Sequence, residues 1–162
     1  DFNMFLIKIL VSRKRKHMNT IKNYQTYTNK TIDKSSCVEI QLGKQRKKRF
    51  KETSIFFNSD DFLLLEQTIW DNYREYSPDS VVKIQTEEWV KIIRGIKELR
   101  KLLQNPVYND ELISNLNIKS FDKEFYKENY LLINKNIDKM LNSFIEWIEP
   151  NLQNDEYISI TG

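Results

Sequence analysis

The sequence contains few of the residues on which most enzyme sites depend. Its 162 residues include one histidine, one cysteine, three glycines and three prolines. A Ser-His-Asp or Cys-His site needs an imidazole beside its nucleophile, and the single histidine, His17, lies in a basic stretch outside any core pattern. Three glycines are too few for a phosphate-binding loop or a dinucleotide fingerprint. We therefore predict no catalytic residues and no enzyme activity, with carboxylate-only chemistry kept as a third hypothesis.

The lone cysteine, Cys37, has no second cysteine with which to form an internal disulfide. Free thiols are typical of reducing compartments, so we expect a cytoplasmic location and a buried, structural Cys37. A zinc site needs several Cys or His ligands, and no loop has the acidic spacing of a calcium site, so we predict no metal and no cofactor. No apolar run approaches the roughly 18 residues of a transmembrane helix, and we expect no membrane partner.

Charge is divided unevenly along the chain. Residues 1–51 contain 14 Lys and Arg against three acidic residues, whereas residues 52–162 contain 12 against 20. Such asymmetry is typical of a basic tail attached to an acidic body. We therefore predict a basic, poorly structured lead-in over residues 1–34 and a single α+β domain over residues 35–162.

The lead-in contains a junction between His17 and Met18. His-Met is a common product of gene cloning, and Met18 can serve as the natural start, so we expect residues 1–17 to be non-native. Their removal would take away five basic residues and Asp1, and the net charge would fall from +3 to −1. The alternative, that residues 1–17 belong to the natural chain, stays open.

Alternation of apolar and polar residues indicates strands. It is clearest over residues 38–42, where Gly43 then opens a polar turn, and a second β-prone run follows over residues 53–57. These two runs predict an antiparallel hairpin. A short β-branched run over residues 81–84 and an alternating run over residues 157–160 predict two further strands, the last of which is expected to return to the hairpin.

Helical periodicity, with apolar residues three and four positions apart, covers most of the remaining chain. It predicts helices over 60–76, 86–104, 110–116, from Ser120 onward, and over 133–149. The sum is an α+β fold, with a small antiparallel sheet packed by four or five helices. Gly95 lies inside the second helix, where glycine costs about 1 kcal/mol relative to alanine, so we expect close packing against another element there.

A basic loop follows the first predicted strand. Its basic residues are Lys44, Arg46, Lys47, Lys48 and Arg49. Such a cluster can contact phosphates, which makes it a candidate nucleic-acid-binding site. No interleaved aromatic residues and no recognised nucleic-acid motif accompany it, and a polar hairpin tip is usually a solvated loop.

The helix predicted over 60–76 carries a mixed face. On a wheel of 100° per residue, its acidic residues gather opposite the apolar stripe, and Leu64 falls among them. The structural interpretation is that a neighbouring element buries Leu64. The functional interpretation is an apolar anchor ringed by acids, which is the anatomy of a protein-binding hot spot. We assign the partner-binding surface to five residues of this face: Asp60, Leu64, Gln67, Asp71 and Glu75.

Two segments resemble bacterial immunity proteins, the dedicated inhibitors of contact-dependent growth-inhibition and other polymorphic toxins. The segments run from Ser54 to Trp70 and from Val81 to Trp89, and each follows a strand with a capped, acidic helix. The resemblance covers a minor part of the chain and carries over no functional residue by motif. It implies a non-enzymatic protein that binds and neutralises a cognate toxin domain, often a nuclease with a basic substrate groove.

Two functional hypotheses from different classes follow. The first is an immunity protein whose acidic side chains occupy phosphate positions on a basic toxin domain, which speeds association and seals the toxin's site. The alternative is a nucleic-acid-associated accessory or regulatory protein that uses the basic N-terminal third of the chain.

Overall fold

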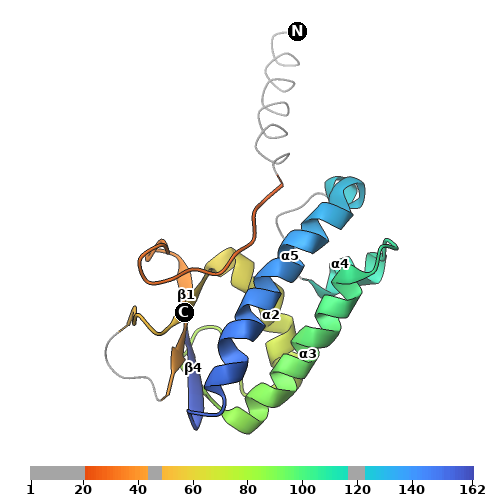
Figure 1. The fold of residues 1–162 in the computed structure, drawn as a ribbon. Coiled ribbons are helices and arrows are strands. Elements are labelled where there is room, and N and C mark those ends of the chain that lie inside the picture. The colour runs from red at the N-terminus through yellow and green to blue at the C-terminus, as the bar shows by residue number, and fades with distance from the viewer. Residues whose placement is uncertain (1–20, 44–48, 117–122) are drawn as a thin grey trace.

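The fold combines one sheet with helices packed against it, in a computed structural model that describes residues 21–43, 49–116 and 123–162 (Figure 1). The helices of these residues are α2 (Ser59–Asn72), α3 (Thr86–Gln104), α4 (Asp110–Asn115) and α5 (Lys123–Asn151). The predicted α+β class is confirmed, with a small antiparallel sheet and four helices in the described part of the chain.

The sheet has four strands in the order β2-β1-β4-β3, and every pairing is antiparallel. The strands are β1 (Cys37–Leu42), β2 (Ile55–Asn58), β3 (Val82–Gln85) and β4 (Tyr157–Thr161). β1 and β2 form the predicted hairpin, while β4 pairs with β1 on one side and with β3 on the other. The predicted return of the last strand to the hairpin is thus confirmed, and it leaves β2 and β3 as the outer strands.

One face of the sheet is apolar and packs against the helices. Alternate strand residues, such as Ile40 on β1 and Ile158 on β4, are buried in one core cluster with α2, α3 and α5. The ring of Phe144 on α5 makes edge-to-face contacts with Phe57 of β2 and Trp89 of α3, with centroids 5.5 and 6.1 Å away. The indole N–H of Trp89 donates to the main-chain oxygen of Ile158 at 3.1 Å, which joins helix and sheet directly.

A single long helix, α5, replaces the two helices that were expected after residue 120. Its buried residues run from Tyr126 to Ile148, with the half-buried Tyr130 between Tyr126 and Ile133. The adjacent Leu131 and Leu132 interrupt the helical spacing in the sequence, but they lie on the exposed side of α5 and leave the buried stripe intact. Ser120, the expected start of the first helix, lies outside the described residues.

Helix α2 ends four residues before its predicted end at Tyr76, because Tyr73 leaves the helix with φ −144° and ψ 92°. The Asn72 side chain donates to the main-chain oxygen of Thr68 at 2.8 Å, a local bond by which asparagine competes with the helical pattern. The following residues form a turn, in which the Tyr76 N–H donates to the Tyr73 oxygen at 3.1 Å. Glu75, which the sequence pattern placed on the helix, therefore lies beyond it.

The described part of the predicted basic lead-in, residues 21–34, packs against the rest of the described chain. This stretch contains little regular secondary structure, yet Tyr24 and Ile32 are buried. Tyr27 forms a β-bridge with β2 and covers its outer edge. The sequence shows no sign of this packing, because Tyr24 and Ile32 are separated by polar residues and show no period. Residues 1–17, which were expected to be non-native, lie outside the described residues.

An ion pair ties this stretch to α2. The Lys22 ammonium group bonds the carboxylate of Asp61, which is completely buried in the first turn of α2. Burial raises the pKa of Asp61 above its usual value of 3.8, although the hydrogen bond and charge of Lys22 act in the opposite direction. One carboxylate oxygen of Asp61 has no hydrogen-bond partner among the described residues. The ion pair thus compensates only part of the cost of burying this charge.

Helices α2 and α3 pack closely at Gly95, as its position in the sequence predicted. A Cβ atom at this position would lie 2.6 Å from Nδ2 of Asn72 and 2.9 Å from Cγ2 of Thr68.

We predict that Gly95→Ala destabilises the fold by about 1–3 kcal/mol, because the overlap outweighs the roughly 1 kcal/mol gained in helix propensity. Chemical denaturation measures the difference. Adding Asn72→Ala removes one overlapping side chain and should recover part of the loss; a stable Gly95→Ala protein would contradict the tight packing.

Asp61→Asn should raise the melting temperature at neutral pH, because it removes an incompletely compensated buried charge. A carboxyl group whose pKa is raised by folding binds its proton more tightly in the folded state, so its charge opposes folding above that raised pKa. The gain should therefore shrink as the pH falls toward 3.8, the usual value of this group. Thermal melts across this pH range test the expectation, with the exposed Asp60→Asn as the matched control. A lower melting temperature at neutral pH would show that the Lys22 ion pair outweighs the cost of burial.

Candidate functional site

Four of the five residues assigned to the partner-binding surface are exposed, and the fifth is not. Asp60, Gln67 and Asp71 lie on the exposed side of α2, and Glu75 is exposed in the turn that follows. Leu64 is only 4% exposed and belongs to the main core cluster. Its proposed role as an exposed apolar anchor is therefore wrong, and the structural interpretation of Leu64 holds.

Leu64 is buried because α2 is covered on more than one side. The helix packs against α3 and against β1 and β2, while the chain around Lys22 reaches Asp61 from a further direction. The buried arc therefore extends past Asp61 to Leu64, toward the side that the wheel had assigned to solvent. The exposed arc is displaced in the opposite direction, toward Trp70.

Trp70, rather than Leu64, is the exposed apolar side chain of α2. Its side chain is 45% exposed, although a wheel of 100° per residue places it within the apolar stripe of the helix. The guanidinium group of Arg74 lies 3.8 Å from the centroid of its ring, which is a cation–π contact. Gln67 donates to Asp71 at 2.9 Å beside it. We call Asp60, Gln67, Trp70 and Asp71 the α2 face: an exposed aromatic side chain with two carboxylates on the same side of one helix.

The position of Trp70 at the border of the apolar stripe was the signal that could have revealed it. On the wheel it falls about 80° from Phe62, near one edge of the stripe, where a small rotation of the helix exposes it. Tryptophan is also the residue that most often dominates binding at protein interfaces. An exposed tryptophan beside acids is therefore a stronger candidate anchor than the leucine chosen from the sequence.

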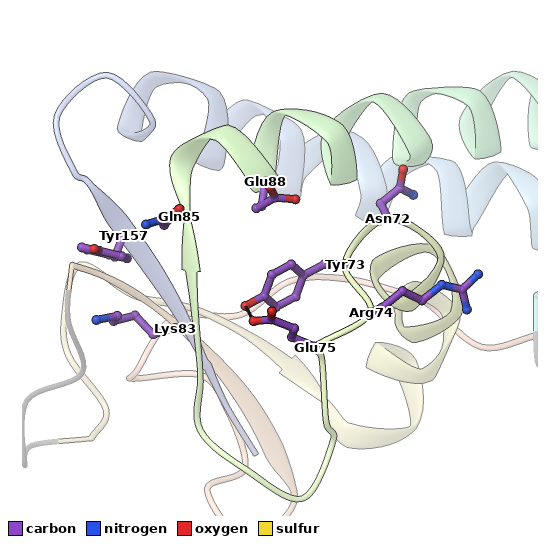
Figure 2. Close-up of a pocket in the computed structure, with 8 residues that line it drawn as sticks. All are labelled: Asn72, Tyr73, Arg74, Glu75, Lys83, Gln85, Glu88 and Tyr157. Atoms are coloured by element: carbon purple, nitrogen blue, oxygen red, sulfur yellow. Dashed lines mark hydrogen bonds between the residues drawn. The ribbon is translucent and has the colours of Figure 1, made fainter.

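A groove of about 560 Å³ lies next to the α2 face (Figure 2). The turn after α2 forms one wall, and β3, β4 and the first turn of α3 form the others. The volume is within the range of sites that hold small molecules or side chains. The residues that line it are mostly polar: Asn72, Tyr73, Arg74, Glu75, Lys83, Gln85, Glu88 and Tyr157.

Negative charge gathers at the centre of the groove. The Tyr73 hydroxyl donates to Oε2 of Glu75 at 3.0 Å, and both side chains point toward each other in Figure 2. Burial raises the pKa of Tyr73, and the Glu75 hydrogen bond and the charges of Glu75 and Glu88 raise it further. Glu88 is held by Lys91, which donates to its two oxygens at 2.9 and 3.1 Å. Glu75 forms no ion pair with a described residue, so it is the carboxylate open to an external cation.

The two cations of the groove walls are turned to other partners. The ammonium group of Lys83 lies 4.2 Å from the centroid of the Tyr157 ring. Arg74 points away from Tyr73 and Glu75 in Figure 2, since its guanidinium group stacks on Trp70. The middle of the groove is thus bounded by acceptor groups and an aromatic ring.

The basic loop is described only at its last residue. The other four residues assigned to possible nucleic-acid binding, Lys44, Arg46, Lys47 and Lys48, lie outside the described residues. Nε of Arg49 lies 3.9 Å from Oε2 of the buried Glu39, and its guanidinium group lies 5.1 Å from the Phe50 ring centroid. Glu39 also accepts the N–H groups of Phe50 and Lys51 at 2.9 and 3.0 Å. Arg49 therefore has a structural role in joining this loop to β1.

Comparisons with protein-family models, with curated proteins and with solved structures find no match. Within residues 21–43, 49–116 and 123–162, no helix is long and apolar enough to cross a membrane. The same residues contain no group of three or more His, Cys, Asp or Glu side chains placed to hold a metal ion. The α2 face and the groove beside it are therefore the candidate functional regions of the described chain.

Proposed function

We propose that the chain is a non-enzymatic immunity protein, which binds a basic toxin domain through the α2 face and neutralises it in the bacterial cytoplasm. The observation that carries the proposal is the exposed Trp70 beside Asp71, with the exposed Asp60 in the first turn of the same helix. Exposed aromatic residues surrounded by polar neighbours are the usual centre of binding energy at protein interfaces. The resemblance of residues 54–70 and 81–89 to immunity proteins supports the same function.

The charge around Trp70 favours a basic partner. Asp60, Asp71 and Glu75 are all exposed along one stretch of the chain, and Arg74 compensates Asp71 only weakly, at 4.0 Å between exposed groups. Acidic side chains on an inhibitor attract the phosphate-binding groove of a nuclease from a distance and increase the association rate. A toxin nuclease is therefore the partner class that we propose.

The nucleic-acid alternative receives less support from the described residues. It depends on the basic loop, of which Arg49 alone is described, and Arg49 lies against Glu39 and Phe50. We carry forward the immunity function alone.

Trp70→Ala should weaken binding to the toxin domain encoded next to this chain's gene by roughly 30-fold, mainly through faster dissociation, since hot-spot truncation costs about 2 kcal/mol or more. Reversal of Asp71 and Glu75 to lysine should instead slow association and reduce its dependence on salt. Surface-immobilised binding measurements at several salt concentrations separate the two rate constants. Co-expression with the toxin domain then shows whether weaker binding also lowers protection of growth.

Leu132→Ala is the matched control, because Leu132 is exposed to a similar extent, at 48%, but lies on α5. It should leave both rate constants unchanged. Equal binding by the Trp70→Ala and Leu132→Ala proteins would reject the α2 face as the interface. Failure of the unmodified chain to protect cells from the toxin domain would reject the immunity function itself.

A further inference from the structure

The outer edge of β3 presents unpaired main-chain groups. The Thr86 N–H donates to the Glu156 oxygen at 3.1 Å, so these two residues form a hydrogen-bonded pair just beyond β3 and β4. Such pairs alternate along antiparallel strands, which makes Val82 and Ile84 the β3 residues whose main chain bonds β4. The N–H and C=O groups of Lys83 and Gln85 therefore point away from β4.

No described residue bonds the outward N–H and C=O groups of Lys83 or the outward N–H of Gln85. The Gln85 C=O is different, because Gln85 is the N-cap of α3 and its oxygen accepts the first hydrogen bond of that helix. The two side chains are exposed, whereas those of Val82 and Ile84 are buried. An unpaired, exposed strand edge is a template on which another extended chain can form hydrogen bonds. The other outer strand, β2, differs in this respect, because Tyr27 pairs with it.

The groove described above lies beside this same edge. Lys83 and Gln85 line it from β3, while Tyr73 and Glu75 line it from the turn after α2 (Figure 2). Glu75 forms no ion pair with a described residue, and the Lys83 ammonium group lies over the ring of Tyr157. The edge thus combines main-chain donors and acceptors with a local negative charge.

We propose that a short extended segment of the protein partner pairs with the outer edge of β3 and places a basic side chain in the groove against Glu75. The inference relies on the proposed function for the existence of a protein partner, and it adds a second contact region to the α2 face. Edge pairing supplies hydrogen bonds that any sequence can make, and the groove selects the side chain. The segment is short because β3 has four residues and the turn after α2 bounds the groove.

A basic side chain is the occupant that fits the groove. A carboxylate would meet Glu75 and Glu88 without a cation to receive it, because Lys83 and Lys91 are engaged with Tyr157 and Glu88. An arginine side chain could bond Glu75 with two donors and lie flat on the ring of Tyr73. The same guanidinium chemistry could come from free arginine, which the experiment distinguishes from a peptide segment.

The test uses the full chain, labelled with ¹⁵N, and a capped heptapeptide in which threonine and valine alternate around a central arginine. Amide shifts on titration should centre on Lys83 and Gln85. Gln85→Pro should lower the affinity for the peptide by about tenfold, since proline removes one outward N–H donor and blocks approach to the edge of β3. This variant should fold, because Gln85 has φ −68° and its N–H makes no bond to β4. Gln85→Ala, which keeps the N–H, is the control and should bind as the original chain does.

Two further titrations test the side-chain part of the proposal. A peptide with glutamate at its centre should bind more weakly than the arginine peptide, and Glu75→Gln should reduce this difference severalfold. Free arginine should cause much smaller shifts than the peptide, because it makes no edge pairing. Equal binding of the peptide by the Gln85→Pro and Gln85→Ala proteins would overturn the proposal, as would shifts confined to the α2 face.

The peptide titration can fail or succeed independently of the toxin-binding experiment that tests the proposed function. Peptide binding at β3 is measured without the toxin, whereas the Trp70 and Asp71 variants are measured with it. A dimer of the free chain that Gln85→Pro dissociates would overturn the proposal in another way, because the occupant of the edge would be a second copy of this chain.

Discussion

The insertion of β4 between β1 and β3 is the constraint on which the rest of the fold depends. β1 and β3 share no hydrogen bonds, so the hairpin and the later part of the chain are joined in the sheet through β4 alone among the described strands. The bond from Trp89 to the main chain of Ile158 ties α3 to the same strand. Because β3 pairs only with β4 among the described strands, it is an outer strand, and the main-chain N–H groups of Lys83 and Gln85 point away from β4. The position of β4 in the sheet therefore shapes both the core and the groove.

The close packing of α2 on α3 determines which side of α2 can bind a partner. Because Gly95 has no side chain, Thr68 and Asn72 approach the backbone of α3, and the rotation of α2 is fixed by that contact. In this rotation Leu64 is directed into the core and Trp70 to solvent. Asn72 also bonds the main chain one turn back, at the point where the helix ends. The residues that follow are thereby released from the helix and line the groove.

Much of the fold could be predicted from the sequence because its signals are local. The alternation around Ile40 marks a strand, and the glycine inside the second helix marks close packing. The exposed side of α2 could not be placed, since a wheel gives the angle between residues but not the width of the buried arc. That width depends on the chain around Lys22, whose contact with Asp61 spans 39 positions. The groove was missed for a similar reason: it brings together Glu75, from a turn expected to be helical, and residues of two strands.

In the α2 face and in the groove a cation of the chain lies over an aromatic ring, which is exposed in Trp70 and half-buried in Tyr157. Arg74 covers Trp70 and Lys83 covers Tyr157, at 3.8 and 4.2 Å from the ring centroids. Each contact contributes only about 0.5–1 kcal/mol at an exposed site. A basic partner can therefore displace either cation at little cost and pair with the carboxylates that remain. An acidic partner could release the same cations as easily, but it would meet the unpaired carboxylate of Glu75, so the carboxylates rather than the cations favour a basic partner.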